Sequence, residues 1–337
     1  MDMNLTRPTS RELYLVALLM TSAGPAAAQE VLFNVHNEHP LIQIHAPPAP
    51  GERAAVAPGE WRWNLDLRLN NNSIEEGDAG VERIVLDGET YRTALTLVRG
   101  LRPGLAVAAT VPFVAHSSGF LDGFIIDWHD LWGLSNERRN GFENNQLDFS
   151  YQRDGIEELA LRDLGRGLGD VRLDFDWHLR RAGRSERSLV VRGGVKLPTG
   201  DSDALLGSGG TDLSLQLLSS DHKSLAHWNI SLAWSVGALW LGESDVLDAV
   251  REDFVGIASA GLRWHITPRF EAGMQLDMHT AMYDSELRTL GRGSVQLSSG
   301  FGMRLNDGSL LELAMIQNLR TDTTPDFGVY FGWRSSP

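Results

Sequence analysis

The sequence predicts an all-β protein, a transmembrane antiparallel up-and-down β-barrel of about twelve strands. Three observations support this fold class. Strand-length segments alternate apolar and polar residues, the connections between them alternate in length, and the N-terminus resembles a secretory leader. A membrane barrel requires the first pattern because its strands face lipid on one side and the lumen on the other.

The alternation is clearest in Trp61 to Leu69, which reads W-R-W-N-L-D-L-R-L, and it returns in Val171 to Leu179, V-R-L-D-F-D-W-H-L. Successive side chains of a strand point to opposite faces, so each segment has one apolar face and one charged face. Aromatic residues fall on the apolar face, many near segment ends, which is typical of the girdles of a membrane barrel. A soluble β-sandwich with these aromatics in its core is the alternative.

We predict strands over 60–69, 90–99, 105–114, 170–179, 188–197, 211–219, 228–237, 253–265, 269–279, 294–305, 310–317 and 326–334. The connections at 100–104, 180–187, 220–227, 266–268 and 306–309 are short and rich in turn residues. The connections at 70–89, 115–169, 198–210, 238–252, 280–293 and 318–325 are mostly longer. Short turns at one end and long loops at the other are typical of outer-membrane barrels.

Composition limits the remaining classes. The chain has 337 residues, no cysteine and a net charge of -14, which argues against nucleic-acid binding because that needs a basic face. Arg7 and Arg11, the apolar run Leu13 to Met20 and the small residues Ala26 to Ala28 predict a signal peptide over 1–28. The predicted location is therefore the bacterial outer membrane.

The mature chain is predicted to consist of an N-terminal segment and a barrel. Residues 29–58 contain five prolines, which predicts an irregular periplasmic or plug-like segment rather than a strand. Residues 59–335 form the predicted barrel. Its last strand, Asp326 to Arg334, resembles the C-terminal strand that the barrel-assembly machinery recognises, although such strands usually end on an aromatic residue and this one continues past Trp333.

The connection 115–169 holds the densest motifs. Apolar residues from Leu121 to Leu134 recur at spacings of three and four, which predicts a helix in a long extracellular or lumenal loop. That helix either constricts the lumen as a gate or only caps the barrel mouth. His116 and Ser118 form an H-x-S pair similar to that of outer-membrane phospholipase A, but the following Asn of that motif is missing.

Metal binding by His116, Asp122, Asp127, His129 and Asp130 matches no standard zinc spacing. Asp201, Asp203 and Asp212 are weak calcium candidates in a loop that we expect to be a shaped hairpin. We therefore predict no cofactor, no metal and no catalytic residue.

Charged side chains of both signs fall on the predicted lumen face: Arg62, Asp66, Arg68, Arg92, Arg172, Asp174, Asp176, His178, Arg192, Lys196, Arg263, Glu271, Asp277, His279 and Arg304. They line a wet channel or pair across the lumen and fill it. The candidate gate and lumen residues are His116, Ser118, Asp122, Trp128, His129, Arg62, Arg68, Arg172, Asp174, Asp176, Arg192 and Lys196.

The stretch F-V-A-H-S-S-G-F-L-D-G-F-I-I-D-W-H-D-L-W-G-L-S-N, with V-L-D-G-E-T-Y-R before it, K-L-P-T-G-D-S-D after it and the opening N-E-H-P-L-I-Q-I, resembles an uncharacterised family of bacterial envelope proteins, domain of unknown function 3187. The resemblance covers about residues 31–335. It implies an outer-membrane barrel distantly similar to barrels for hydrophobic compounds, and it supplies no catalytic residue.

The predicted function is a passive channel or transporter for small amphiphilic or hydrophobic molecules. The alternatives are an outer-membrane lipid hydrolase using His116 and Ser118, and a structural barrel with a plugged lumen. The predicted partners are outer-membrane lipids, the barrel-assembly machinery and an unknown small-molecule substrate.

Overall fold

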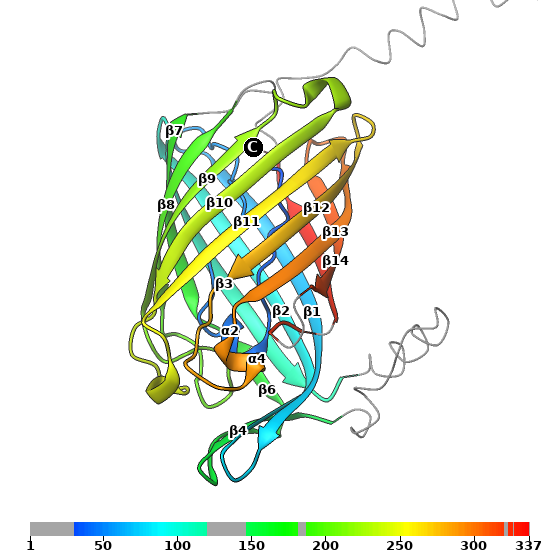
Figure 1. Cartoon of the computed structure of the whole chain (residues 1–337). Helices are drawn as coiled ribbons and strands as arrows, with labels where there is room; N and C mark the ends of the chain where they lie inside the picture. Colours follow the sequence, from blue (N-terminus) through cyan, green and yellow to red (C-terminus); the bar gives the residue numbers. More distant parts are fainter. Residues whose placement is uncertain (1–29, 120–145, 181–186, 320–322, 326, 337) are drawn as a thin grey trace, which may run out of the picture.

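The protein is a closed antiparallel β-barrel of twelve strands, with three short strands added at one end, as the computed structural model shows (Figure 1). The structure describes residues 30–119, 146–180, 187–319, 323–325 and 327–336. The barrel strands are β1 (Trp61–Asp78), β2 (Glu82–Arg102), β3 (Leu105–Ser117), β7 (Val171–Arg180), β8 (Leu189–Leu197), β9 (Asp212–Asp221), β10 (Ile230–Trp240), β11 (Phe254–His265), β12 (Phe270–His279), β13 (Ser294–Arg304), β14 (Leu310–Asn318) and β15 (Phe327–Arg334). All twelve predicted strands are present.

The barrel closes where the first strand pairs with the last. In β1 and β15 the register runs from Asn64 opposite Arg334 to Asn71 opposite Phe327. The remaining strands pair in order around the wall, with β3 followed by β7. Because no barrel strand is left with an unpaired edge, the wall satisfies its own backbone hydrogen bonds, as the bilayer requires.

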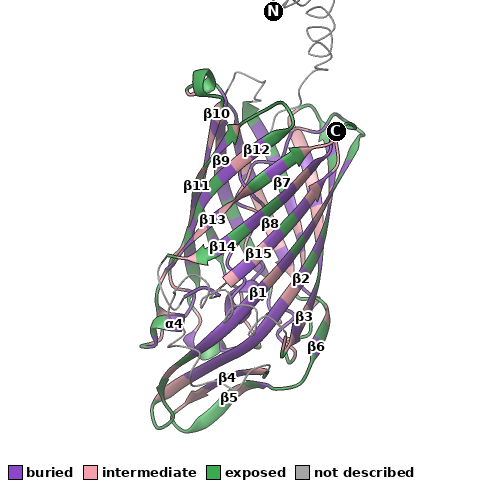
Figure 2. Ribbon diagram, turned by 90° about the vertical axis from the view of Figure 1, so that its right-hand side faces the viewer, coloured by how far each residue is buried: buried purple, intermediate pink, exposed green. Residues whose placement is uncertain are grey.

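Alternation along the strands produces two distinct faces. In β1, Arg62, Asn64, Asp66 and Arg68 are buried, while Trp61 and Trp63 on the other face are about half exposed. Figure 2 shows the same alternation of buried and exposed residues along many strands of the wall. Exposed side chains on the outside are largely apolar, which is the band that contacts hydrocarbon in an outer-membrane barrel.

The two ends of the barrel differ as predicted. Short connections and the C-terminus lie at the upper end in Figure 1, and the long loops lie at the lower end. Outer-membrane barrels have short periplasmic turns and longer extracellular loops, so the upper end is periplasmic and the lower end extracellular. Trp61, Trp177, Trp228 and Trp264 are exposed near the periplasmic end, where aromatic side chains suit the headgroup region.

The predicted loop over 70–89 is wrong, because β1 and β2 continue as a hairpin that projects beyond the barrel. Pairing runs without interruption from Asn70 opposite Thr90 to Asp78 opposite Glu82. Residues 70–73, an N-N-N-S run with poor strand propensity, are buried here. Glu76 also accepts hydrogen bonds from the backbone of the short helix α4 (Arg288–Gly291). Tertiary packing therefore overrides the local preference.

The hairpin is widened by β4 (Asp148–Arg153) and β5 (Ile156–Leu161), and β6 (Gly165–Leu168) adds to the end of β3. Strand β2 changes its partner from β3 to β4 at Gly88, which has a φ of +142°. A Cβ atom there would lie 2.8 Å from the side chain of Leu147. Gly88 thus allows one long strand to serve two sheets.

The helix predicted over Leu121 to Leu134 lies outside the described residues. Helical structure in the described ranges is limited to single turns: α2 (Pro40–Gln43), η2 (Ala226–Trp228), η3 (Asp248–Val250) and α4. Across those ranges, no helix combines the length and apolar character needed to cross a bilayer.

Candidate functional site

Residues 30–58, which we call the lumenal segment, run inside the barrel (Figure 1). A first arm (30–39) passes from the periplasmic end to the helical turn α2 near the extracellular end. A second arm (44–58) returns to Pro58, which bridges to Gly100 at the periplasmic end of β2. Apart from that bridge, the segment forms no strand pairing with the wall among the described residues, so side chains hold it in place.

The first arm is anchored by acidic side chains on wall arginines. Glu30 binds Arg62 at 3.1 Å and also contacts Arg334. Glu38 binds Arg68 at 2.7 Å, and Asn34 donates to Asp66 at 2.6 Å. The wall partners in these contacts all belong to β1 and β15. The first arm therefore lies against the seam where the barrel closes.

Ring stacking and side-chain amides add to this contact. The Phe33 ring packs edge-on against Tyr330, with 6.2 Å between centroids, and the guanidinium of Arg263 lies 4.3 Å from its centre. Gln275 accepts from the backbone N–H of Phe33 at 2.7 Å, and its own amide donates back to the Phe33 carbonyl. The wall therefore supplies partners for the backbone of an extended peptide.

The tip of the segment is the turn α2. Pro40 occupies its first position, where no amide hydrogen is needed, and His39 caps it by accepting from the Leu41 N–H. Tyr283 donates to the Leu41 carbonyl at 2.7 Å, and Gln43 donates to the Leu205 carbonyl at 2.9 Å. The turn is thus fastened to two extracellular loops.

An apolar cluster covers this tip, and we call it the outer cap. It joins Leu41, Ile42 and Ile44 of the segment to the extracellular loops and the β1–β2 extension. The main loop and strand contributors are Ile74, Ile84, Leu86, Phe149, Leu205, Leu241, Val250, Met282, Leu287 and Leu290. A hydrophobic core built from these loops therefore covers the tip of the segment at the extracellular end.

The second arm carries a basic anchor. Arg53 donates to Asp174 at 2.6 Å and to Asp176 at 3.1 Å, both on β7. Arg192 of β8 holds Asp176 from the other side at 2.6 Å and donates to the segment carbonyls of Ala49 and Gly51. Each group is buried, and each aspartate also pairs with a wall arginine, so Arg53 joins the second arm to ion pairs that the wall already contains.

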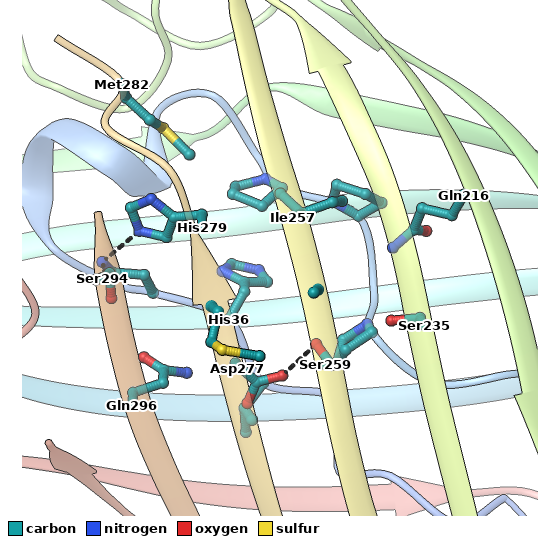
Figure 3. Close-up of a pocket in the computed structure, with 17 residues that line it drawn as sticks. His36, Gln216, Ser235, Ile257, Ser259, Asp277, His279, Met282, Ser294 and Gln296 are labelled. Atoms are coloured by element: carbon teal, nitrogen blue, oxygen red, sulfur yellow. Dashed lines mark hydrogen bonds between the residues drawn. The ribbon is translucent and has the colours of Figure 1, made fainter. Parts of the chain in front are cut away.

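Cavities along the segment are small. The largest of three has a volume of about 40 Å³, and two others measure about 20 Å³ each. Roughly 10–15 Å³ of such volume accommodates one water molecule. Figure 3 shows the largest, where His36, Asp277, His279 and Gln296 surround a space between the segment and strands β11 to β13. Each cavity has room for only a few water-sized groups, which is too little for a drug-sized molecule.

The structure places the predicted lumen residues inside the barrel. Arg62, Arg68, Arg172, Asp174, Asp176, Arg192 and Lys196 are all buried, and all of them lie in ion pairs. Lys196 binds Asp170 at 2.8 Å and Asp212 at 3.0 Å, and Asp212 also meets His45 of the second arm. Of the calcium candidates, Asp212 is therefore paired with Lys196, and Asp203 is exposed.

His116 is buried, and both of its ring nitrogens have partners. One lies 3.0 Å from the Thr90 hydroxyl and the other 3.1 Å from the Leu205 carbonyl. Ser118 follows the end of β3 and is exposed. His116 therefore supports the 198–211 loop, which contributes Leu205 to the outer cap. His116 and Ser118 are not paired as base and nucleophile.

Asp122, Trp128 and His129, together with Asp127 and Asp130 of the metal hypothesis, lie outside the described residues. Within the ranges that are described, no three His, Asp or Glu side chains are grouped as metal ligands would be.

The sequence reasoning missed the residues that fasten the segment. Glu30, Glu38, Glu52 and Arg53 were not singled out, because an irregular stretch has no periodicity to assign their direction. A usable signal is present, since four charged residues and the apolar triplet Leu41, Ile42 and Ile44 stand out in a proline-rich lead-in.

Comparisons with known proteins agree with this fold. A family profile described as "Protein of unknown function (DUF3187)" matches residues 13–336. No curated protein matches the chain in sequence. Among solved structures, the COG4313 outer membrane channel from Pseudomonas putida F1 is similar, with a TM-score of 0.54 and 15% identity, covering 83% of this chain and 96% of that one. That likeness shows a shared fold.

Two further structures match less well. The toluene transporter TodX of P. putida has a TM-score of 0.41 and 11% identity, over 83% of this chain and 91% of its own. The Ralstonia pickettii toluene transporter TbuX has a TM-score of 0.39 and 9% identity, over 83% and 90%.

Proposed function

The chain belongs to the DUF3187 family, and we propose that it is an outer-membrane channel whose lumen is closed by its own lumenal segment. The observation that carries the proposal is the separation of wall from filling. The twelve strands close on each other through β1 and β15, whereas the segment is held by side chains and one backbone bridge. The segment can therefore leave without breaking the wall.

Barrel size supports this view. Barrels of about eight strands are filled by their own side chains, and barrels of sixteen or more leave an aqueous channel. Twelve strands fall between these limits, so the interior needs a filling or remains open. Here the inner wall is charged and polar, with buried Arg62, Asn64, Asp66 and Arg68 on one strand alone. Once the segment has moved, such a wall would be wetted.

The proposed solute is a small amphiphilic molecule. From the extracellular side it would first meet the apolar outer cap and then the charged lumen, so a molecule with both characters suits the path. The P. putida F1 protein that shares the fold is described as an outer membrane channel, which is compatible with conduction. The other proposed partners are outer-membrane lipids and the barrel-assembly machinery, which would recognise β15.

The test is removal of the lumenal segment. A variant lacking residues 30–56, with the leader and Pro58 retained, should fold and conduct steadily in planar bilayers, and vesicles containing it should swell rapidly in small sugars. The intact chain should stay closed for most of the time. A matched control removes residues 152–157 from the exposed β4–β5 hairpin, which is far from the lumen, and should behave like the intact chain.

A folded deletion variant that remains silent would contradict the channel proposal and favour a plugged structural barrel. The observation that favours a plugged structural barrel is that Arg53 and Glu30 of the segment both form ion pairs with the wall. No comparable observation favours lipid hydrolysis, because the His116 ring nitrogens are occupied by Thr90 and Leu205.

A further inference from the structure

A second cavity lies between the lumenal segment and the wall formed by β1, β2, β3 and β7. Its volume is about 20 Å³, room for one water-sized particle. Four arginines and one carboxylate line it, with threonine hydroxyls beside them. The polar lining includes Arg53, Arg68, Arg92, Arg172, Asp174 and Thr96.

Three of the four arginines have carboxylate partners. Arg53 and Arg172 share Asp174, at 2.6 Å and 2.8 Å. Arg68 binds Glu38 at 2.7 Å and also donates to the Nε2 atom of His36 at 2.9 Å. Because arginine can only donate, that nitrogen of His36 carries no proton, and His36 is an acceptor there.

Arg92 differs from the other three. Its side chain is buried, at 5% exposure, yet it forms no hydrogen bond or ion pair within the part of the chain that the structure describes. It stands directly opposite Arg68 in the β1–β2 register, and like charges placed opposite each other are destabilising.

The two carboxylates that attract Arg92 electrostatically, Glu38 and Asp66, are already engaged. Glu38 holds Arg68, while Asp66 accepts from Asn34 at 2.6 Å and from the Tyr330 hydroxyl at 2.9 Å. A buried cation without a partner is costly, and a guanidinium presents several donors in a fixed fork that suits an anion.

We propose that this cavity is a binding site for one small monovalent anion, a halide or a compact carboxylate such as formate, held by Arg92 next to Arg68 and Arg172. The anion supplies the acceptor that Arg92 lacks among the described residues. Its site joins wall strands to both arms of the lumenal segment, so an occupied site favours the docked segment. This inference does not depend on conduction.

The experiment uses the full chain in detergent. Crystals soaked in sodium bromide should show an anomalous peak within hydrogen-bonding distance of the Arg92 guanidinium. In solution, the thermal unfolding temperature should be higher in bromide or formate than in gluconate at equal ionic strength, because gluconate is too large for the cavity. Arg92→Gln should abolish this rise, while Arg99→Gln, on the outward face of the same strand, should keep it.

The measurements in bromide and in formate identify the anion. A rise in unfolding temperature with either salt supports the site, and the larger rise indicates which anion it prefers. The proposal is overturned if bromide occupies surface positions only and the unfolding temperature is the same in all three salts. It is also overturned if Arg92→Gln retains the full response. Should that variant fail to fold, the bromide position in the unmodified chain still decides the question.

Discussion

At the scale of single residues, Arg53 joins the second arm to the wall through two ion pairs. Its guanidinium bridges Asp174 and Asp176, which Arg172 and Arg192 also hold. All five groups are buried, so these charges pair with one another rather than with bulk water. Removing one member of such a network costs more free energy than breaking an exposed ion pair.

We therefore expect Arg53→Met to weaken docking of the second arm by about 1.5–3 kcal/mol, the usual worth of a hydrogen bond to a charged group, because Asp174 and Asp176 keep Arg172 and Arg192 as partners. The measured result should be frequent channel openings in planar bilayers where the unmodified chain shows few. Arg83→Met, which removes an exposed pair with Glu75, is the matched control and should cost about 0–1 kcal/mol. Equal behaviour of both variants would show that Arg53 does not hold the segment closed.

Glu52 gives the second arm a dependence on pH. This carboxyl belongs to the segment at the periplasmic end, where it accepts hydrogen bonds from Ser188 and from Ser220. Burial raises its pKa to about 7, with Glu30 adding repulsion and the two hydroxyls and Arg192 opposing the rise. His178 also faces it, with 3.8 Å between Nδ1 and Oε1.

The raised pKa of Glu52 fixes how docking of the second arm depends on pH. The docked carboxyl binds its proton more tightly than a solvated one, so docking is favoured in acid and loses stability as the pH rises toward and through about 7. We expect open probability to increase between pH 5.5 and 8.5, measured in bilayers. Glu52→Gln should flatten this rise, and a variant that keeps the full pH response would assign it to another group.

At the scale of elements, the barrel strands were predictable because a lipid face and a lumen face impose a period of two. Arg62, Asp174 and Arg192 all point inward as that period requires. Their partners were not predictable, since Arg53 meets Asp174 across 121 positions and the period fixes direction without naming a contact.

The elements that the sequence did not reveal depend on tertiary contacts. The β1 extension contains Asn71 and Asn72, which prefer turns, but it is buried among the hairpin, β4 and α4. The turn α2 is too short to show a helical period, and its identity rests on Pro40 and the His39 cap. Both form part of the closure at the extracellular end, where the outer cap brings distant loops together.

At the scale of the whole molecule, the outside of the barrel determines where the protein resides. Leu67 lies near the middle of Trp61–Asn70, the part of β1 within the barrel wall, and it faces outward with 39% exposure. An arginine at the bilayer midplane of a barrel costs about 2–4 kcal/mol, while one near the interface costs about 0–1 kcal/mol. The position of the apolar band therefore predicts a gradient of effects.

Leu67→Arg should lower the free energy of unfolding in lipid vesicles by about 2–4 kcal/mol, measured by denaturant titration with the intact segment in place. Val81→Arg is the control, because Val81 is exposed at the tip of the β1–β2 hairpin beyond the band, and it should change little. In detergent micelles, where the apolar layer adapts to the charge, the difference between the two variants should shrink. If Leu67→Arg and Val81→Arg were equally mild in vesicles, the outward face of β1 would not lie in hydrocarbon, and the same wall could not separate lipid from the lumen.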